Sequence, residues 1–82
     1  MKISVIKSNK DKVSFNFAKG IGMKVIELEQ NEEVDKKIEE LIKNDYKNII
    51  LSNEVAGFSE DIIKKYSNSK DINIYIAPSK RN

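Results

Sequence analysis

The 82-residue sequence has no cysteine, no histidine and no tryptophan, and it contains a single proline and three glycines. Without cysteine there is neither a disulfide framework nor thiol chemistry. Without histidine the chain lacks the commonest metal ligand and the side chain best suited to proton transfer near neutral pH. These absences argue against an enzyme, and we expect a non-catalytic protein with no catalytic residues, no cofactor and no metal site.

An excess of one charge and long apolar runs are also missing. Fifteen Lys and Arg face thirteen Asp and Glu, and the two signs alternate along the chain, so nucleic acid is not an expected partner. No window approaches the roughly 20 apolar residues of a membrane span. The opening Met1–Ile6 is too short for a secretory signal. We therefore expect a cytoplasmic domain with no direct membrane insertion.

The clearest pattern lies in the C-terminal half. Ile49–Leu51 and Ile72–Ile76 are short apolar runs, and between them the apolar residues of Asn53–Tyr66 recur at helical spacing. Uninterrupted β-branched runs are typical of strands covered on both faces, and two of them joined by a helix form a parallel crossover unit. This part predicts strand, helix, strand, with Ile49–Leu51 as a central strand.

The N-terminal half repeats the alternation. Lys2–Ile6 and Met23–Leu28 are rich in β-branched residues and predict strands, while Glu32–Lys43 carries one apolar stripe and predicts a helix. The whole pattern predicts one α/β domain over residues 1–78, with a parallel four-stranded sheet of order 2-1-3-4 flanked by three helices, as in flavodoxin-like and receiver-like folds. Residues 79–82 are expected to form a disordered tail.

The stretch of residues 12–18 fits two structures. Val13 and Phe17 lie four residues apart, Asp11 can cap and Gly20 can end a helix. Val13, Phe15 and Phe17 also alternate with polar residues, which is the period of a half-buried strand. We expect the helix, and a strand in a hairpin remains open.

Candidate chemical motifs are weak. A receiver-like site needs carboxylates after the first and third strands, and the chain has Lys7-Ser8 and Ser52-Asn53 there, which cannot gather a divalent metal. The serines have no histidine to activate them, so capping and turn roles are expected for Ser14, Ser52 and Ser59. Gly20–Gly22 precedes a strand, which favours a turn over a phosphate loop. Tyr46 and Tyr75 are expected to pack in the core with their hydroxyl groups at its rim.

Several local phrases resemble the F subunit of vacuolar/archaeal-type rotary ATPases. The first strand, Lys2–Ile6, matches the family's Lys-Ile-x-Val-Ile opening. The apolar strand Ile49–Leu51, the helix opening Glu54-Val55 and the closing phrase Ile76–Lys80 match the later part of the family pattern. The family's first-helix phrase is matched by Asp11, Val13, Phe15, Phe17 and Gly20. The resemblance covers nearly the whole chain.

The chain also departs from the family pattern. Lys7-Ser8 replaces Gly-Asp after the first strand, the glycine before Phe15 is missing, and Ala77 intervenes before Pro78. The sequence also ends where the family usually continues into a mobile C-terminal helical segment. We expect that segment to be absent.

The resemblance implies a central-stalk protein that binds the long coiled-coil D subunit, rotates with it in the ATPase or ATP synthase, and supports coupling to proton or sodium transport without binding nucleotide. The protein would then be peripheral to a membrane complex. The residues expected to bind the D-like partner are Asn16, Lys19, Gly20, Ile21, Ser59 and Lys65.

Two other readings remain. Val13–Phe17 is similar to a phrase in small α/β domains that handle iron–molybdenum cluster precursors. In those domains the segment after the first strand forms a hairpin, and the absence of cysteine and histidine counts against cluster binding here. A phosphate-handling α/β enzyme is opposed by the lack of a glycine-rich loop between a strand and a helix.

Overall fold

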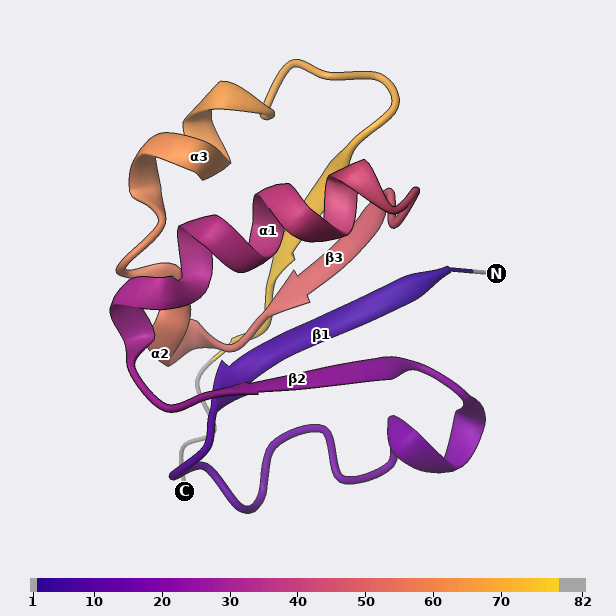
Figure 1. Ribbon diagram of the computed structural model, residues 1–82, viewed down its shortest axis with the longest axis vertical. Coiled ribbons are helices and arrows are strands. Elements are labelled where there is room, and N and C mark those ends of the chain that lie inside the picture. Colours follow the sequence, from indigo (N-terminus) through magenta and orange to yellow (C-terminus); the bar gives the residue numbers. More distant parts are fainter. Residues whose placement is uncertain (1, 79–82) are drawn as a thin grey trace.

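The computed structural model describes residues 2–78 and contains a four-stranded sheet in the order β2-β1-β3-β4. All three strand pairs are parallel. Figure 1 shows the elements alternating along the chain and the strands lying side by side. The elements are β1 (Ile3–Ser8), η1 (Lys19–Ile21), β2 (Lys24–Leu28), η2 (Asn31–Glu33), α1 (Val34–Lys43), β3 (Asn48–Leu51), α2 (Asn53–Ala56), α3 (Glu60–Lys65) and β4 (Asn73–Ile76). The predicted sheet and its strand order are confirmed, whereas the tail predicted at 79–82 lies outside the described residues.

The strand register separates the two faces of the sheet. Ile6 pairs with Leu51 and Ile26, and Leu51 pairs with Ile76. Since paired residues of neighbouring strands point to the same face, these side chains share one face. Val5, Val25 and their partners in β3 and β4 point to the other face, which we call the rear face.

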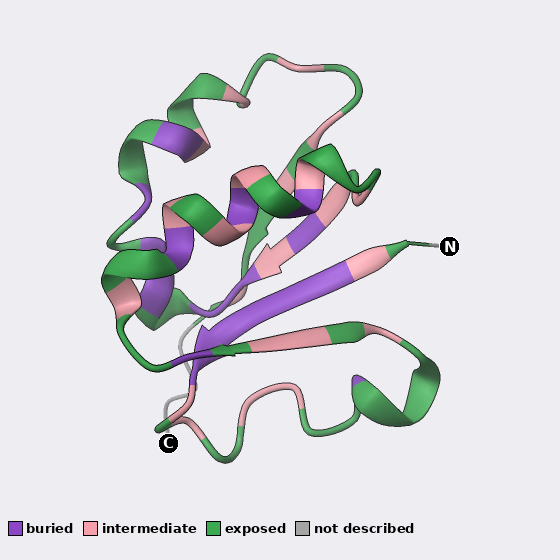
Figure 2. Cartoon of the chain, in the orientation of Figure 1, coloured by how far each residue is buried: buried purple, intermediate pink, exposed green. Residues whose placement is uncertain are grey.

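The main core lies between the first face and the helices. Ile6, Ile49 and Leu51 are fully buried there against apolar residues of α1, α2 and α3. Figure 2 shows β1 buried over most of its length, as expected for a strand with neighbours on both sides. The helical face therefore contains the larger part of the buried apolar surface.

The connection between β1 and β2 lies on the opposite side of the sheet from the helices (Figure 1). The helix predicted over residues 12–18 is wrong, and so is the alternative hairpin, because β1 and β2 are parallel and the segment consists of turns before η1. Asp11 caps no helix, but it holds a turn, since its Oδ1 accepts hydrogen bonds from the backbone N–H groups of Val13 (3.0 Å) and Ser14 (2.9 Å). The helix does not propagate because Phe15 adopts a positive φ of 60°.

The helix predicted over Asn53–Tyr66 is divided into α2 and α3. Ser52 caps α2 through a hydrogen bond from Val55 N–H to its Oγ, and tight turns follow at Phe58 and Ser59. The predicted apolar stripe is correct for Ile62, Ile63 and Tyr66, which pack against the core. It is wrong for Phe58, which the break between the helices leaves exposed.

The helix predicted over Glu32–Lys43 forms, with its first residues in the 3-10 turn η2 and the remainder in α1. Val34, Ile38 and Leu41 are its buried stripe, at the expected spacing. No helix among residues 2–78 is both long enough and apolar enough to cross a bilayer.

Candidate partner-binding surface

Lys7 occupies the carboxyl end of β1, where a receiver-like protein would hold carboxylates for a metal. The residue is buried, and its Nζ donates a 2.8 Å hydrogen bond to the carbonyl oxygen of Ser14 and lies 3.8 Å from Oε2 of Glu27 on β2. Its charge is thus used to hold the β1–β2 connection against the rear face. Within residues 2–78 no group of three metal-ligating side chains comes together.

The serines near this edge of the sheet form hydrogen bonds that stabilise turns and a helix start. Ser8 Oγ accepts a 3.1 Å hydrogen bond from Lys10 N–H, and Ser52 Oγ caps α2. Ser14 contributes its backbone N–H to Asp11 and its carbonyl oxygen to Lys7. The turn role predicted for Ser14 and the capping role predicted for Ser52 are confirmed, whereas the Ser59 hydroxyl makes no capping hydrogen bond to α3.

The Asp11 turn also carries an electrostatic consequence. Hydrogen bonds from the backbone and side chain of Ser14 hold the pKa of the Asp11 carboxyl below its usual value, assisted by the Val13 N–H and the nearby Lys7 charge and opposed by partial burial. The ionised carboxylate is therefore the form that fixes the turn. This turn positions the exposed segment that follows it.

The segment after Asp11 exposes large apolar side chains. Val13, Phe17 and Ile21 are each between 63% and 65% exposed, whereas Ala18 between them is fully buried. Asn16, Lys19 and Gly20 are also exposed on this segment. We call the set Val13, Asn16, Phe17, Lys19, Gly20 and Ile21 the loop surface.

A groove adjoins the loop surface at the carboxyl end of β4. It has a volume of about 420 Å³, and residues 13–17 form one wall while Ala77 and Pro78 form the other. Its lining mixes apolar side chains with Ser14 and Asn16. Such a groove offers both apolar and polar groups to a partner, as protein-binding sites commonly do.

The six predicted partner-binding residues do not form one surface. Asn16, Lys19, Gly20 and Ile21 are exposed on the β1–β2 connection, but Ser59 is buried, and its hydroxyl donates a 2.7 Å hydrogen bond to Oδ1 of Asp35. Ser59 is therefore wrong as a surface contact, because its hydroxyl joins the start of α3 to α1.

Lys65 is exposed on α3, on the helical side of the sheet. Its Nζ lies 3.4 Å from Oε2 of Glu39 and 5.2 Å from the ring centre of Tyr66. Glu39 chiefly accounts for the raised pKa of Lys65. Because the loop surface is on the opposite side, one partner contact cannot combine Lys65 with Asn16 in a small interface.

Sequence reasoning missed the exposed rear-face residues. Tyr75 was expected in the core, yet it is 52% exposed, while Tyr46 packs against the core as expected. Val13 and Phe17 were expected four residues apart on one helix; that helix does not form, and the turn at Phe15 leaves both side chains exposed. The available signal was the alternation of apolar and polar residues, which showed that a helical pattern was not the sole possibility.

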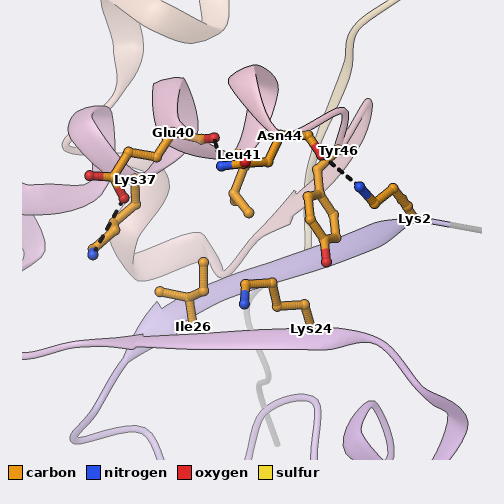
Figure 3. Close-up of a pocket in the computed structure, with 8 residues that line it drawn as sticks. All are labelled: Lys2, Lys24, Ile26, Lys37, Glu40, Leu41, Asn44 and Tyr46. Atoms are coloured by element: carbon orange, nitrogen blue, oxygen red, sulfur yellow. Dashed lines mark hydrogen bonds and ion pairs between the residues drawn. The ribbon is translucent and has the colours of Figure 1, made fainter.

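A second pocket, of about 540 Å³, lies between α1 and β2 at the opposite end of the sheet (Figure 3). Three lysines line it, and two of them have partners: Lys2 donates to the carbonyl oxygen of Asn44 at 2.7 Å, and Lys37 lies 3.6 Å from Glu40. Lys24 extends into the pocket in Figure 3. The pocket is cationic, but its ammonium groups mainly serve contacts within the protein.

Comparison with known proteins adds no relative. The chain matches no protein-family model, no curated protein and no solved structure. The structure defines a compact α/β domain with a parallel sheet of order 2-1-3-4 and interspersed helices.

Proposed function

We propose that this chain is a non-catalytic central-stalk subunit of a vacuolar/archaeal-type rotary ATPase or ATP synthase, corresponding to its F subunit. In this role it binds a D-like coiled-coil subunit and the surrounding complex. It supports rotary coupling and the regulation of ATP hydrolysis or synthesis with ion transport. The protein would work in the cytoplasm, peripheral to the membrane part of the complex.

The observation that carries the proposal is the loop surface. Three large apolar side chains, those of Val13, Phe17 and Ile21, are mostly exposed on a segment fixed by Asp11 and Lys7. Large apolar side chains that stay exposed along an ordered segment offer apolar contact area to a partner. An amphipathic helix of a coiled coil supplies a matching apolar stripe.

The choice of partner rests on the resemblance in sequence. Asp11, Val13 and Phe17 belong to the phrase that matches the family, and all three lie in the segment that forms or supports the loop surface. Lys12 and Lys19 are exposed near its apolar residues. Their charges favour a partner helix with acidic residues beside its apolar stripe, because complementary charges assist association and fix orientation.

The position of Lys7 supports a function without catalysis. Its ammonium group stands at the carboxyl end of β1, where parallel α/β sheets commonly hold their ligands. Because Lys7 is buried and bonded to the Ser14 carbonyl oxygen, this position stabilises the fold. We therefore assign the proposed partner binding to the exposed surface of the protein, and no ligand binding to the carboxyl end of β1.

The test is binding to the D-like coiled-coil protein from the same organism, measured by co-purification and calorimetry. Phe17→Glu replaces the centre of the loop surface by a charge, and Asn16→Glu and Lys19→Glu change its polar groups. Lys65→Glu is the matched control, because Lys65 is also an exposed residue but lies on the helical side. We expect a one-to-one complex that Phe17→Glu weakens by roughly tenfold or more, as for an apolar contact near the centre of an interface.

Two outcomes would count against the proposal. A folded D-like protein that does not bind this chain would exclude the stalk function. A complex weakened by Lys65→Glu but not by Phe17→Glu would place the binding surface on the helices, and the loop surface would lose its assigned role.

A further inference from the structure

The outer edge of β4 has backbone groups that no strand among residues 2–78 uses. Asn73 N–H donates to the carbonyl oxygen of Lys47 at 2.7 Å, and Ala77 N–H donates to that of Leu51 at 2.9 Å. The backbone N–H groups of Asn73 and Ala77 are therefore directed toward β3. Because alternate residues of a strand direct their N–H and C=O groups to opposite sides, those of Ile74 and Ile76 are directed outward.

The side chains at this edge are also unprotected. β4 has the sequence Asn-Ile-Tyr-Ile with no charged residue, and Tyr75 and Ile76 are about half exposed. The opposite edge strand, β2, carries Lys24 and Glu27. Charged residues on an edge strand discourage pairing with another chain, so β4 is the edge suited to accept a further strand.

We propose that β4 pairs with β4 of a second copy of this chain, antiparallel and about a two-fold axis at Tyr75. The inference goes beyond the proposed function, because it concerns an edge of the sheet outside the loop surface. Ile74 of each copy would exchange both backbone hydrogen bonds with Ile76 of the other. The two sheets would join into one sheet of eight strands.

Charge on α3 supports a second copy as the occupant. Glu60 and Asp61 lie in its first turn, and Lys64 and Lys65 lie in its last. An antiparallel partner brings the acidic end of one α3 toward the basic end of the other, and the two-fold axis repeats the contact. The charges on α3 are therefore complementary to those on α3 of a second copy related by the two-fold axis.

A groove between α3 and the outer edge of β4 is lined by charged residues of α3. It has a volume of about 730 Å³, and Glu60, Lys64, Ile63 and Ile76 are among its lining residues. With α3 of the second copy across this groove, Glu60 would face Lys64 of that copy, while the apolar residues below would be covered. The same pairing would bury Ile76 on this side and Tyr75 on the rear face.

The register follows from the residues within β4. Pairing Ile74 with Ile76 uses both outward-directed residues of the strand and puts the two Tyr75 side chains opposite one another at a non-hydrogen-bonded site. Side chains approach closely at such sites, and aromatic pairs stabilise them. Pro78 has no N–H group and cannot extend the ladder in the C-terminal direction.

The absence of cysteine permits a direct test of this register. Residues opposite at a non-hydrogen-bonded site have Cα atoms about 4.5 Å apart, which is within the range for a disulfide. Tyr75→Cys should therefore give a covalent dimer on mild oxidation. Asn73→Cys is the matched control, because it lies on the same strand and face but would oppose Ala77 in the second copy. Equal cross-linking of both variants, or of neither, would overturn the proposed register.

Sedimentation of the protein without added cysteine tests the pairing itself. Ile76→Pro removes one outward N–H while leaving the bonds between β3 and β4, and Ile76→Thr retains that N–H. We expect a dimer that Ile76→Pro weakens at least tenfold more than Ile76→Thr, with circular dichroism showing both variants folded. A wild-type monomer at high concentration, or equal dimerisation of the two variants, would refute the proposal.

Charge reversal provides an independent test. Glu60→Lys should weaken the dimer by roughly two- to tenfold, since exposed ion pairs contribute modestly and this one occurs twice. Adding Lys64→Glu should restore association. Failure of the double variant to recover would exclude the α3 contact. None of these measurements involves the D-like protein, so their failure is distinguishable from failure of the proposed function.

Discussion

The Nζ atom of Lys7 donates a 2.8 Å hydrogen bond to the carbonyl oxygen of Ser14, seven residues later in the chain. In a helix that carbonyl would accept from the N–H of Ala18, which instead donates to the carbonyl oxygen of Phe15. The bond thus holds the β1–β2 connection in its turn conformation. It links a buried charge on the sheet to the position of the exposed loop surface.

Replacing Lys7 by methionine should release this connection. The stem of the side chain is largely retained, but the Ser14 carbonyl oxygen loses its charged donor, which should lower the free energy of unfolding by about 1–3 kcal/mol. Urea unfolding measures the change. Lys10→Met is the matched control, because Lys10 is exposed, and it should change stability by less than about 0.5 kcal/mol. Equal effects of the two variants would show that the Lys7 bond does not stabilise the fold.

Asp11 should give the turn a dependence on pH. Its folded-state pKa lies below the usual value of 3.8, chiefly because of the Ser14 hydrogen bonds. A lowered folded-state pKa means that the stabilisation is complete above the usual pKa and is lost as pH falls through the folded value. Asp11→Ala should cost about 0.5–2 kcal/mol near neutral pH, as loss of a cap does.

The measurement is the difference in unfolding free energy between wild type and Asp11→Ala as pH is lowered. The difference should shrink below the usual carboxyl pKa, because protonated Asp11 is a weaker acceptor. Asp71→Ala serves as the control, because Asp71 is an exposed aspartate whose φ lies outside the left-handed region. A difference that stays constant through this pH range would show that the ionised Asp11 carboxylate is not what stabilises the turn.

The sequence was sufficient to predict the sheet because short β-branched runs alternated with helical stripes. Ile49–Leu51 had the uninterrupted apolar character of a central strand, and β3 occupies that position. The predicted strand order was that of flavodoxin-like folds, in which strands and helices alternate along the chain in the same way. These patterns reflect burial, which a single sequence records well.

The wrong predictions concern residues whose conformation or burial depends on a tertiary contact. Nothing in the local sequence showed that Lys7 would take the Ser14 carbonyl oxygen, or that Phe15 would adopt a positive φ. Ser59 was expected to contact the D-like partner, but its bond to Asp35 depends on α1 and α3 meeting in space. Partners 24 residues apart in sequence are not visible in a local pattern.

Ser59 allows stability to be separated from partner binding. Ser59→Ala should lower the free energy of unfolding by about 1–2 kcal/mol, because it removes a buried hydrogen bond to a carboxylate. The effects of Ser59→Ala and Asp35→Ala should be smaller together than the sum of the single changes, as expected for a shared bond. Binding of the folded variant to the D-like protein should be unchanged. Fully additive losses would show that the 2.7 Å contact contributes no coupling energy.

Gly22 gives a backbone test of the entry into β2. It ends η1 with φ = 88°, and its N–H donates to the carbonyl oxygen of Lys19. A side chain at this φ is strained even though space is open around the position, so Gly22→Ala should cost roughly 1–2 kcal/mol. Gly20→Ala is the matched control, because its surroundings are equally open and its φ lies outside the left-handed region. Thermal unfolding of the two variants should therefore show a lower midpoint for Gly22→Ala alone; if both midpoints fell equally, the left-handed turn at Gly22 would not be the source of the strain.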